Sequence, residues 1–92
     1  MTPEAKLRKE IKAYLDQIGA YWSMVAGGSY SKVGDPDIIA CINGKYLAIE
    51  AKVDTSQSDW QKLRQRQIED AGGMYIIARS VDDVVTAVEL LG

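Results

Sequence analysis

The feature that most constrains how this 92-residue chain folds is an Asn43-Gly44 pair between two apolar segments. Asn-Gly favours the tight turn of a β-hairpin, because both residues tolerate the positive φ angles that this turn requires. The segment 37–42, DIIACI, then forms one strand, and the segment 45–53, KYLAIEAKV, forms the other. A two-residue turn also determines which residues face each other, so the hairpin predicts specific pairs across its two strands.

Two acidic residues are predicted to meet at the open end of this hairpin. Counting outward from the turn places Asp37 opposite Glu50, with β-carbons about 4.5–5.5 Å apart, where like charges repel. Lys52 projects from the same face as Glu50. A divalent cation would relieve the repulsion, and Mg²⁺ is commonly held by one or two carboxylates with a substrate phosphate. The same residues also fit a structural charge cluster bridged by Lys52, and a register slipped by one residue would separate the acids.

Apolar spacing and end signals predict the elements on either side of the hairpin. A capping hydroxyl followed by proline and an acid is typical of a helix start, and glycine is typical of a helix end. The expected elements are a helix from Thr2 to Gly19, a strand at 20–26, a glycine-rich loop at 27–34, a helix at about 57–71 that begins near Ser56 or Ser58, a strand at 74–78 and a helix from Ser80 to Leu91. We therefore expect one α/β domain over residues 1–92, with a mixed β-sheet flanked by helices in the order α-β-β-β-α-β-α.

Composition excludes several classes of protein. The chain has no histidine, which removes the commonest general base and the commonest zinc ligand. Its one cysteine, Cys41, excludes an internal disulfide framework and fits a reducing compartment. Cys41 has no histidine partner and so is not expected to be a protease nucleophile; its place within a strand predicts a core position. No apolar run approaches the length of a membrane span, so none is expected.

Charge is distributed unevenly along the chain. The net charge is -2, from 11 basic and 13 acidic residues, which argues against binding to nucleic acid by bulk charge alone. Two basic clusters are nevertheless present, and each is either a solvated helix face or a surface for phosphate contacts. The first cluster comprises Lys6, Arg8, Lys9 and Lys12, and the second comprises Lys62, Arg64 and Arg66.

The residues around the hairpin resemble a known nuclease signature. Pro36-Asp37, twelve intervening residues and then Glu50-Ala51-Lys52 resemble the PD-(D/E)xK motif. More narrowly, the chain resembles a virus-type replication-repair nuclease (VRR-NUC) domain, from Glu4 to the strand at 74–78. The matching residues are Gly34-Asp35-Pro36-Asp37, Ile49-Glu50-Ala51-Lys52, Gln61 and Gly72. This resemblance implies a restriction-endonuclease-like fold and hydrolysis of DNA phosphodiester bonds that depends on Mg²⁺ or Mn²⁺.

The resemblance also implies a role for each residue of the motif. Asp37 and Glu50 would bind the metal together with the backbone carbonyl of Ala51, and Lys52 would be the catalytic lysine. Gln61, on the expected helix before Gly72, would hydrogen-bond the lysine or the attacking water. The alternative for Gln61 is an ordinary exposed helix glutamine.

An acid on the first helix usually completes the metal site in this family. Glu4 occupies the family position and extends the apolar stripe of its helix backwards, whereas Glu10 points about 120° away and is the second candidate. Either acid is otherwise a solvated helix residue.

Lys32 and Tyr30, in the loop before Asp37, could contact a phosphate or stack on a base. Trp22 and Trp60 could also stack on nucleotides, but buried positions are the favoured expectation for both.

Short members of the family resemble archaeal Holliday-junction resolvases, which act as dimers on branched DNA. We therefore expect a homodimeric endonuclease with branched DNA as substrate, no organic cofactor, no membrane contact and a place in the cytoplasm of a bacterial or phage-infected cell. Two alternatives remain: a non-catalytic DNA-binding module on a decayed nuclease fold, and a protein-interaction module with surface acids. Dependence on magnesium separates the first expectation from both, and salt-dependent DNA binding separates the two alternatives.

Overall fold

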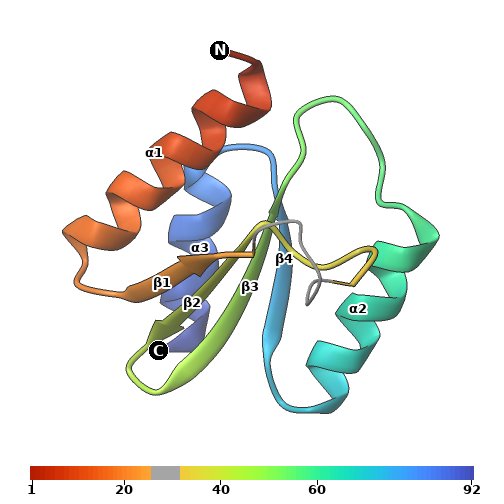
Figure 1. Ribbon diagram of the computed structural model, residues 1–92. Helices are drawn as coiled ribbons and strands as arrows, with labels where there is room; N and C mark the ends of the chain where they lie inside the picture. The colour runs from red at the N-terminus through yellow and green to blue at the C-terminus, as the bar shows by residue number, and fades with distance from the viewer. Residues whose placement is uncertain (26–31) are drawn as a thin grey trace.

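The computed structural model describes residues 1–25 and 32–92, which form a mixed sheet with helices on both of its faces (Figure 1). Its element order confirms the predicted α-β-β-β-α-β-α arrangement. The elements are α1 (Pro3–Gln17), β1 (Tyr21–Met24), β2 (Ile38–Ile42), β3 (Lys45–Ala51), α2 (Asp59–Asp70), β4 (Met74–Ala78) and α3 (Val81–Leu91). The expected strand at 20–26 and loop at 27–34 extend into residues 26–31, and that part of each prediction lies outside the described residues.

The sheet has the strand order β1-β2-β3-β4. The first three strands are antiparallel neighbours, whereas β4 runs parallel to β3 after the crossover through α2. The register of the hairpin is the predicted one, with Ile38 opposite Ile49 and Ile42 opposite Lys45. Asn43 and Gly44 both have positive φ angles, 51° and 79°, as the tight turn requires.

The two faces of the sheet are covered differently. Helices α1 and α3 pack together on one face, and α2 lies on the other (Figure 1). Apolar residues at helical spacing turn one side of α1 towards the sheet. The core on this face comprises Leu7, Ile11 and Leu15 of α1, Ile38, Ala40, Ile42, Leu47, Ile49, Ala51 and Ala78 of the strands, and Val84 and Ala87 of α3. By contrast, α2 buries none of its side chains.

Local end signals account for where the helices begin. The Thr2 hydroxyl accepts a hydrogen bond from the Ala5 amide at 3.1 Å. Ser58 and Gln61 form a reciprocal capping box, in which the Ser58 hydroxyl accepts from the Gln61 amide and the Gln61 side chain accepts from the Ser58 amide. The second helix therefore starts at Asp59, within two residues of its predicted start.

Two predictions about burial are wrong. Cys41 is exposed rather than part of the core. Its side chain alternates away from the α1 face and stands in a row with Tyr21 and Tyr46 of the neighbouring strands. Trp60 is 53% exposed, because it lies on α2, which buries no side chain. Trp22 fits its prediction better, since it is partly buried against the core.

No helix in residues 1–25 and 32–92 combines the length and apolar character needed to cross a membrane.

Candidate active site

A buried carboxyl group marks the open end of the β2–β3 hairpin. Glu50 is 7% exposed and is the one buried charged residue in the described part of the chain. Burial is the largest cause that raises its pKa, and the negative charge and hydrogen bond of Asp37 raise it further, to about 8. Without a cation, the Glu50 carboxyl therefore retains a proton at neutral pH.

Asp37 is held in place by contacts with the segments of β1 and β3 on either side of it and with α1. Its Oδ2 atom accepts a hydrogen bond from the Ala51 amide at 3.0 Å and lies 3.9 Å from Nη1 of Arg8. Its backbone carbonyl accepts from the Val25 amide at 2.9 Å, which continues the β1–β2 pairing. The predicted convergence of Asp37 and Glu50 is therefore present, and Arg8 joins them. Arg8 lies four residues after Glu4, so helical spacing could have placed both on the same face of α1.

Lys52 lies directly beyond the end of β3 and is half-buried. Its amide donates to the Ala78 carbonyl at 3.1 Å, which extends the parallel pairing with β4 by one residue. Its Nζ atom lies 3.4 Å from the Thr55 hydroxyl. The positive charge of Lys52 acts against the other influences on the Glu50 carboxyl and lowers its pKa. The predicted group of two acids and a lysine is thus assembled at one end of the sheet.

Arg79, which follows β4, orders the segment after Lys52. Its Nη1 atom donates to the carbonyls of Lys52 at 3.0 Å, Val53 at 3.5 Å and Thr55 at 3.1 Å. No local sequence pattern points to Arg79, since its partners are more than twenty residues away along the chain. An arginine suits this position because one planar guanidinium presents several donors in a fixed geometry.

The two candidate acids of α1 differ in their relation to this site. Glu4 is half-buried, and its charge contributes to raising the pKa of Glu50. Glu10 is exposed. Within residues 1–25 and 32–92, no three cysteine or acidic side chains are close enough together to hold a metal on their own. The site therefore offers a pair of carboxylates, Asp37 and Glu50, with Glu4 near enough to act through its charge.

A carboxylate pair of this kind fits a hydrated divalent cation. Mg²⁺ takes oxygen ligands and usually keeps several waters, with one or two protein carboxylates. A cation held by Asp37 and Glu50 would relieve the repulsion that adds to the effect of burial on the pKa of Glu50. The donors present are oxygen atoms, which suits Mg²⁺ or Mn²⁺ rather than a thiolate-seeking metal.

A buried hydroxyl lies on the same face of the sheet. Tyr75 on β4 is 4% exposed, and its hydroxyl has no hydrogen-bond partner among the described residues. Burial raises the pKa of this hydroxyl most, the charges of Glu50 and Asp37 raise it further, and the Gln57 side chain acts in the opposite direction. The sequence places Tyr75 only within an apolar strand and gives no sign that its hydroxyl lies within the electrostatic influence of the two acids.

The remaining candidate residues are placed differently. Gln61 uses its Oε1 atom in the capping box of α2, and no hydrogen bond joins it to Lys52 in the described part of the chain. Ala51 contacts Asp37 through its amide. Lys32 is exposed, and its amide donates to Asp35 at 2.7 Å. Tyr30 lies outside the described residues.

Solved structures share the fold that carries this site. The chain has a restriction-endonuclease-like α/β fold. It is similar to a structure described as a VRR_NUC domain, with a TM-score of 0.79 and 20% sequence identity over 97% of this chain and 97% of that one. It is also similar to Hjc of Archaeoglobus fulgidus, a Holliday junction resolvase from an archaeal hyperthermophile. That match has a TM-score of 0.60 and 24% identity, and it covers 80% of this chain and 65% of the resolvase.

Sequence comparison adds no further relative. No protein-family model matches the chain, and no curated protein matches it. The likeness is therefore one of fold, and it confirms the fold that the motif around Asp37 and Glu50 predicted.

Proposed function

We propose that this protein is a Mg²⁺- or Mn²⁺-dependent endonuclease that hydrolyses phosphodiester bonds in DNA. The observation that carries the proposal is the pairing of half-buried Asp37 with buried Glu50 at the end of a sheet with a nuclease fold. Structural carboxylates are normally paired with cations or exposed, because a buried acid beside a second acid destabilises the fold. A buried pair of acids is therefore typical of a site that binds a cation.

Each residue of the pair and its neighbours has a part in the proposed reaction. Asp37, Glu50 and the Ala51 carbonyl would hold the cation, which would supply Lewis-acid chemistry by polarising a phosphoryl oxygen and lowering the pKa of a bound water. Lys52 orients the attacking water and stabilises the negative charge that develops on the phosphate. Gln61 would support that water through its amide nitrogen, because its Oε1 atom is used in the capping box of α2.

DNA is proposed to approach from the end of the sheet that carries these residues. The first turn of α1 and the segment between β3 and α2 both lie at this end (Figure 1). Exposed Lys6 and Lys9 of α1 provide charges for phosphate contacts. Lys32 and Tyr30 are proposed to contact the DNA from the segment before Asp37. The fold shared with a Holliday junction resolvase supports branched DNA as the substrate. A single cysteine fits a cytoplasmic place of action.

A cleavage panel tests the proposal. Holliday junction, flap, splayed and linear DNA of matched sequence are incubated with Mg²⁺, Mn²⁺ or EDTA. We expect cleavage that requires the metal and is fastest on a branched substrate. Equal cleavage of linear and branched DNA would refute the structure specificity alone. No cleavage of any substrate with either metal would refute the nuclease.

A non-catalytic DNA-binding module is the second candidate function. The ion pair between Arg8 and Asp37 favours it, because Arg8 supplies a positive charge to the carboxyl that a cation would otherwise bind. Salt-dependent binding to DNA without cleavage in Mg²⁺ is the result that this candidate predicts.

The two acids of α1 can be separated by matched substitutions. Glu4→Gln is expected to weaken metal-dependent cleavage by about tenfold or more, as loss of a group that supports a metal site does, whereas Glu10→Gln is expected to have a smaller effect. The reason is that Glu4 is half-buried and influences Glu50, while Glu10 is exposed. Cleavage rates across a Mg²⁺ series measure the difference, since excess metal should partly rescue Glu4→Gln. An inactive Glu10→Gln variant beside a fully active Glu4→Gln variant would reassign the role to Glu10.

The protein is expected to be a homodimer in solution. A chain of 92 residues buries a limited core, and apolar side chains such as Leu90, 73% exposed, remain on its surface. A dimer would also supply two sites for paired cuts in branched DNA. Light scattering at micromolar concentration should give about twice the chain mass of 10.1 kDa. A monomer that still cuts both strands of a junction would contradict the paired-site arrangement.

A further inference from the structure

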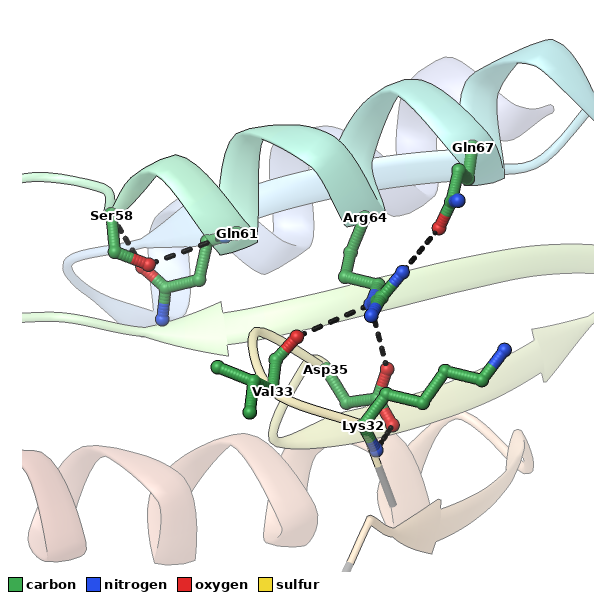
Figure 2. Close-up of polar contacts among 7 residues, drawn as sticks. All are labelled: Lys32, Val33, Asp35, Ser58, Gln61, Arg64 and Gln67. Atoms are coloured by element: carbon green, nitrogen blue, oxygen red, sulfur yellow. Dashed lines mark hydrogen bonds and ion pairs between the residues drawn. The ribbon is translucent and has the colours of Figure 1, made fainter. Parts of the chain in front are cut away.

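The segment that leads into Asp37 is tied to α2 by a polar cluster around Arg64 (Figure 2). Nε of Arg64 donates to the Val33 carbonyl at 3.2 Å and lies 3.5 Å from Oδ1 of Asp35. Nη1 of Arg64 donates to the Gln67 side chain at 2.7 Å. The Arg64 and Asp35 side chains are only 14% and 24% exposed, so solvent screens this ion pair less than a surface pair. We call residues 32–36 the entry segment and these contacts the Arg64 latch.

The entry segment is itself ordered around Asp35. Oδ2 of Asp35 accepts from the Lys32 amide at 2.7 Å, and the Asp35 amide donates to the Lys32 carbonyl at 3.0 Å. One carboxylate oxygen therefore closes a turn while the other faces Arg64. Buried Pro36 follows, and its ring restricts the backbone directly before Asp37. The connection from Arg64 to the carboxyl of Asp37 is short and stiff.

The backbone of the entry segment also lies directly against α2. Gly34 has a φ angle of +86°, a conformation that favours glycine. A Cβ atom at Gly34 would lie 2.5 Å from the carbonyl carbon of Trp60, which is too close for any side chain. Since Trp60 belongs to the first turn of α2, the segment packs directly against the start of this helix.

The latch matters because it adds polar contacts to the packing of α2 on the sheet. None of its side chains is buried, so apolar packing alone holds the helix weakly on the sheet. Arg64 follows Gln61 by three residues, and both lie near the first half of α2. A single guanidinium thus links the helix that carries Gln61 to the entry segment, which leads into Asp37.

We propose that Arg64 is a positioning residue that sets Asp37 for metal binding; this inference rests on the proposed nuclease function. Arg64 acts through Val33 and Asp35 rather than on the substrate, because its donors are directed at these residues and Gln67. Lysine cannot replace it fully, since an ammonium lacks the planar arrangement of donors that meets several acceptors at once.

The test compares Arg64→Ala and Arg64→Lys with Arg66→Ala, a matched arginine that is exposed on the same helix. Mn²⁺ affinity is measured by calorimetry on the whole protein without DNA, and kcat and KM are measured for cleavage. Loss of residues that orient metal ligands typically costs about 10–100-fold in affinity, so Arg64→Ala should bind Mn²⁺ at least about tenfold more weakly. Its kcat should fall more than its KM rises. Arg64→Lys should recover part of the affinity, and Arg66→Ala should bind Mn²⁺ like the wild type.

A double-substitution cycle tests whether Arg64 acts through Asp35. Mn²⁺ affinity is compared among Arg64→Ala, Asp35→Ala and the variant that carries both substitutions. If the latch acts as one unit, the double variant should be no weaker in Mn²⁺ affinity than Arg64→Ala alone. Should Arg64→Ala fail to fold, Arg64→Lys and Asp35→Asn provide the same comparison in milder form. Folded latch variants that bind Mn²⁺ within about twofold of the wild type would overturn the inference. A wild-type protein that neither binds Mn²⁺ nor cuts DNA would refute the nuclease itself and the role of Arg64 with it.

Discussion

Cleavage of DNA is expected to fall by at least about 10²–10³-fold in each of the variants Asp37→Asn, Glu50→Gln and Lys52→Ala, with the fold preserved. The carboxamides each replace a carboxyl group that would bind the cation as an anion. Lys52→Ala removes the positive charge that stabilises the developing negative charge on the phosphate. Single-turnover rates on the best substrate, at saturating Mg²⁺, measure all three losses.

The structure explains why these variants should still fold. Asparagine at position 37 retains a carbonyl oxygen that can accept from the Ala51 amide, as Asp37 does. Glutamine at position 50 keeps the shape of a side chain that is already protonated at neutral pH. The Lys52 side chain makes one hydrogen bond among the described residues, at 3.4 Å to the Thr55 hydroxyl. Lys45→Ala, at the opposite end of the same hairpin, is the matched control. A Glu50→Gln variant that cleaves at nearly the wild-type rate would remove Glu50 from the site.

Glu50→Gln is also expected to raise the stability of the metal-free protein, and to do so more at higher pH. The pKa of Glu50 is raised from 4.5 to about 8 in the fold, first by burial and then by Asp37. Between these values the folded state binds more protons than the unfolded state, so the free energy of unfolding falls as the pH rises through this range. Below this range the carboxyl is protonated in both states, so its ionisation does not lower the free energy of unfolding of the wild type. Glutamine does not ionise, so the free energy of unfolding of the Glu50→Gln variant does not show this fall.

Melting curves in EDTA from about pH 4 to pH 9 measure this effect. The melting temperature of Glu50→Gln should exceed that of the wild type by about 5 °C or more at pH 8 and by little at pH 4, since about 1 kcal/mol shifts melting by about 4–8 °C in a domain of this size. Mg²⁺ should stabilise the wild type and leave the variant unchanged. Glu89→Gln, an exposed carboxylate on α3, is the control. A difference that does not vary with pH would show that Glu50 ionises normally in the fold.

The hairpin and its register could be predicted because their determinants are local. Asn43-Gly44 specifies the turn, and the turn then determines that Ile38 faces Ile49 and that Asp37 reaches Glu50. The helix starts could be predicted equally well, since the Thr2 cap and the Ser58 capping box involve residues three apart in the sequence. The motif that suggested a nuclease fold lies on these same local elements, which is why the sequence sufficed to predict that fold.

The burial of individual residues and the surroundings of the site could not be predicted from local sequence patterns. Cys41 and Ala40 are neighbours in one apolar strand, yet Cys41 is exposed and Ala40 is buried, because a helix pair covers only one face of the sheet there. Trp60 is exposed for a similar reason, since α2 lies on the sheet without burying a side chain. Hydrophobicity predicts that a residue prefers burial, but only tertiary packing decides which face of the sheet is covered by a helix.

The sequence by itself determined the turn, the register and therefore the meeting of Asp37 with Glu50, because each depends on residues joined through one short loop. Tertiary structure alone decided what surrounds that pair. Arg8 reaches Asp37 from α1, Arg79 orders the segment after Lys52 from beyond β4, and Arg64 holds the entry segment from α2. These contacts join residues 24 to 31 positions apart, and no local spacing encodes them. They form only when the sheet and its crossover helix bring distant segments to the same end of the fold.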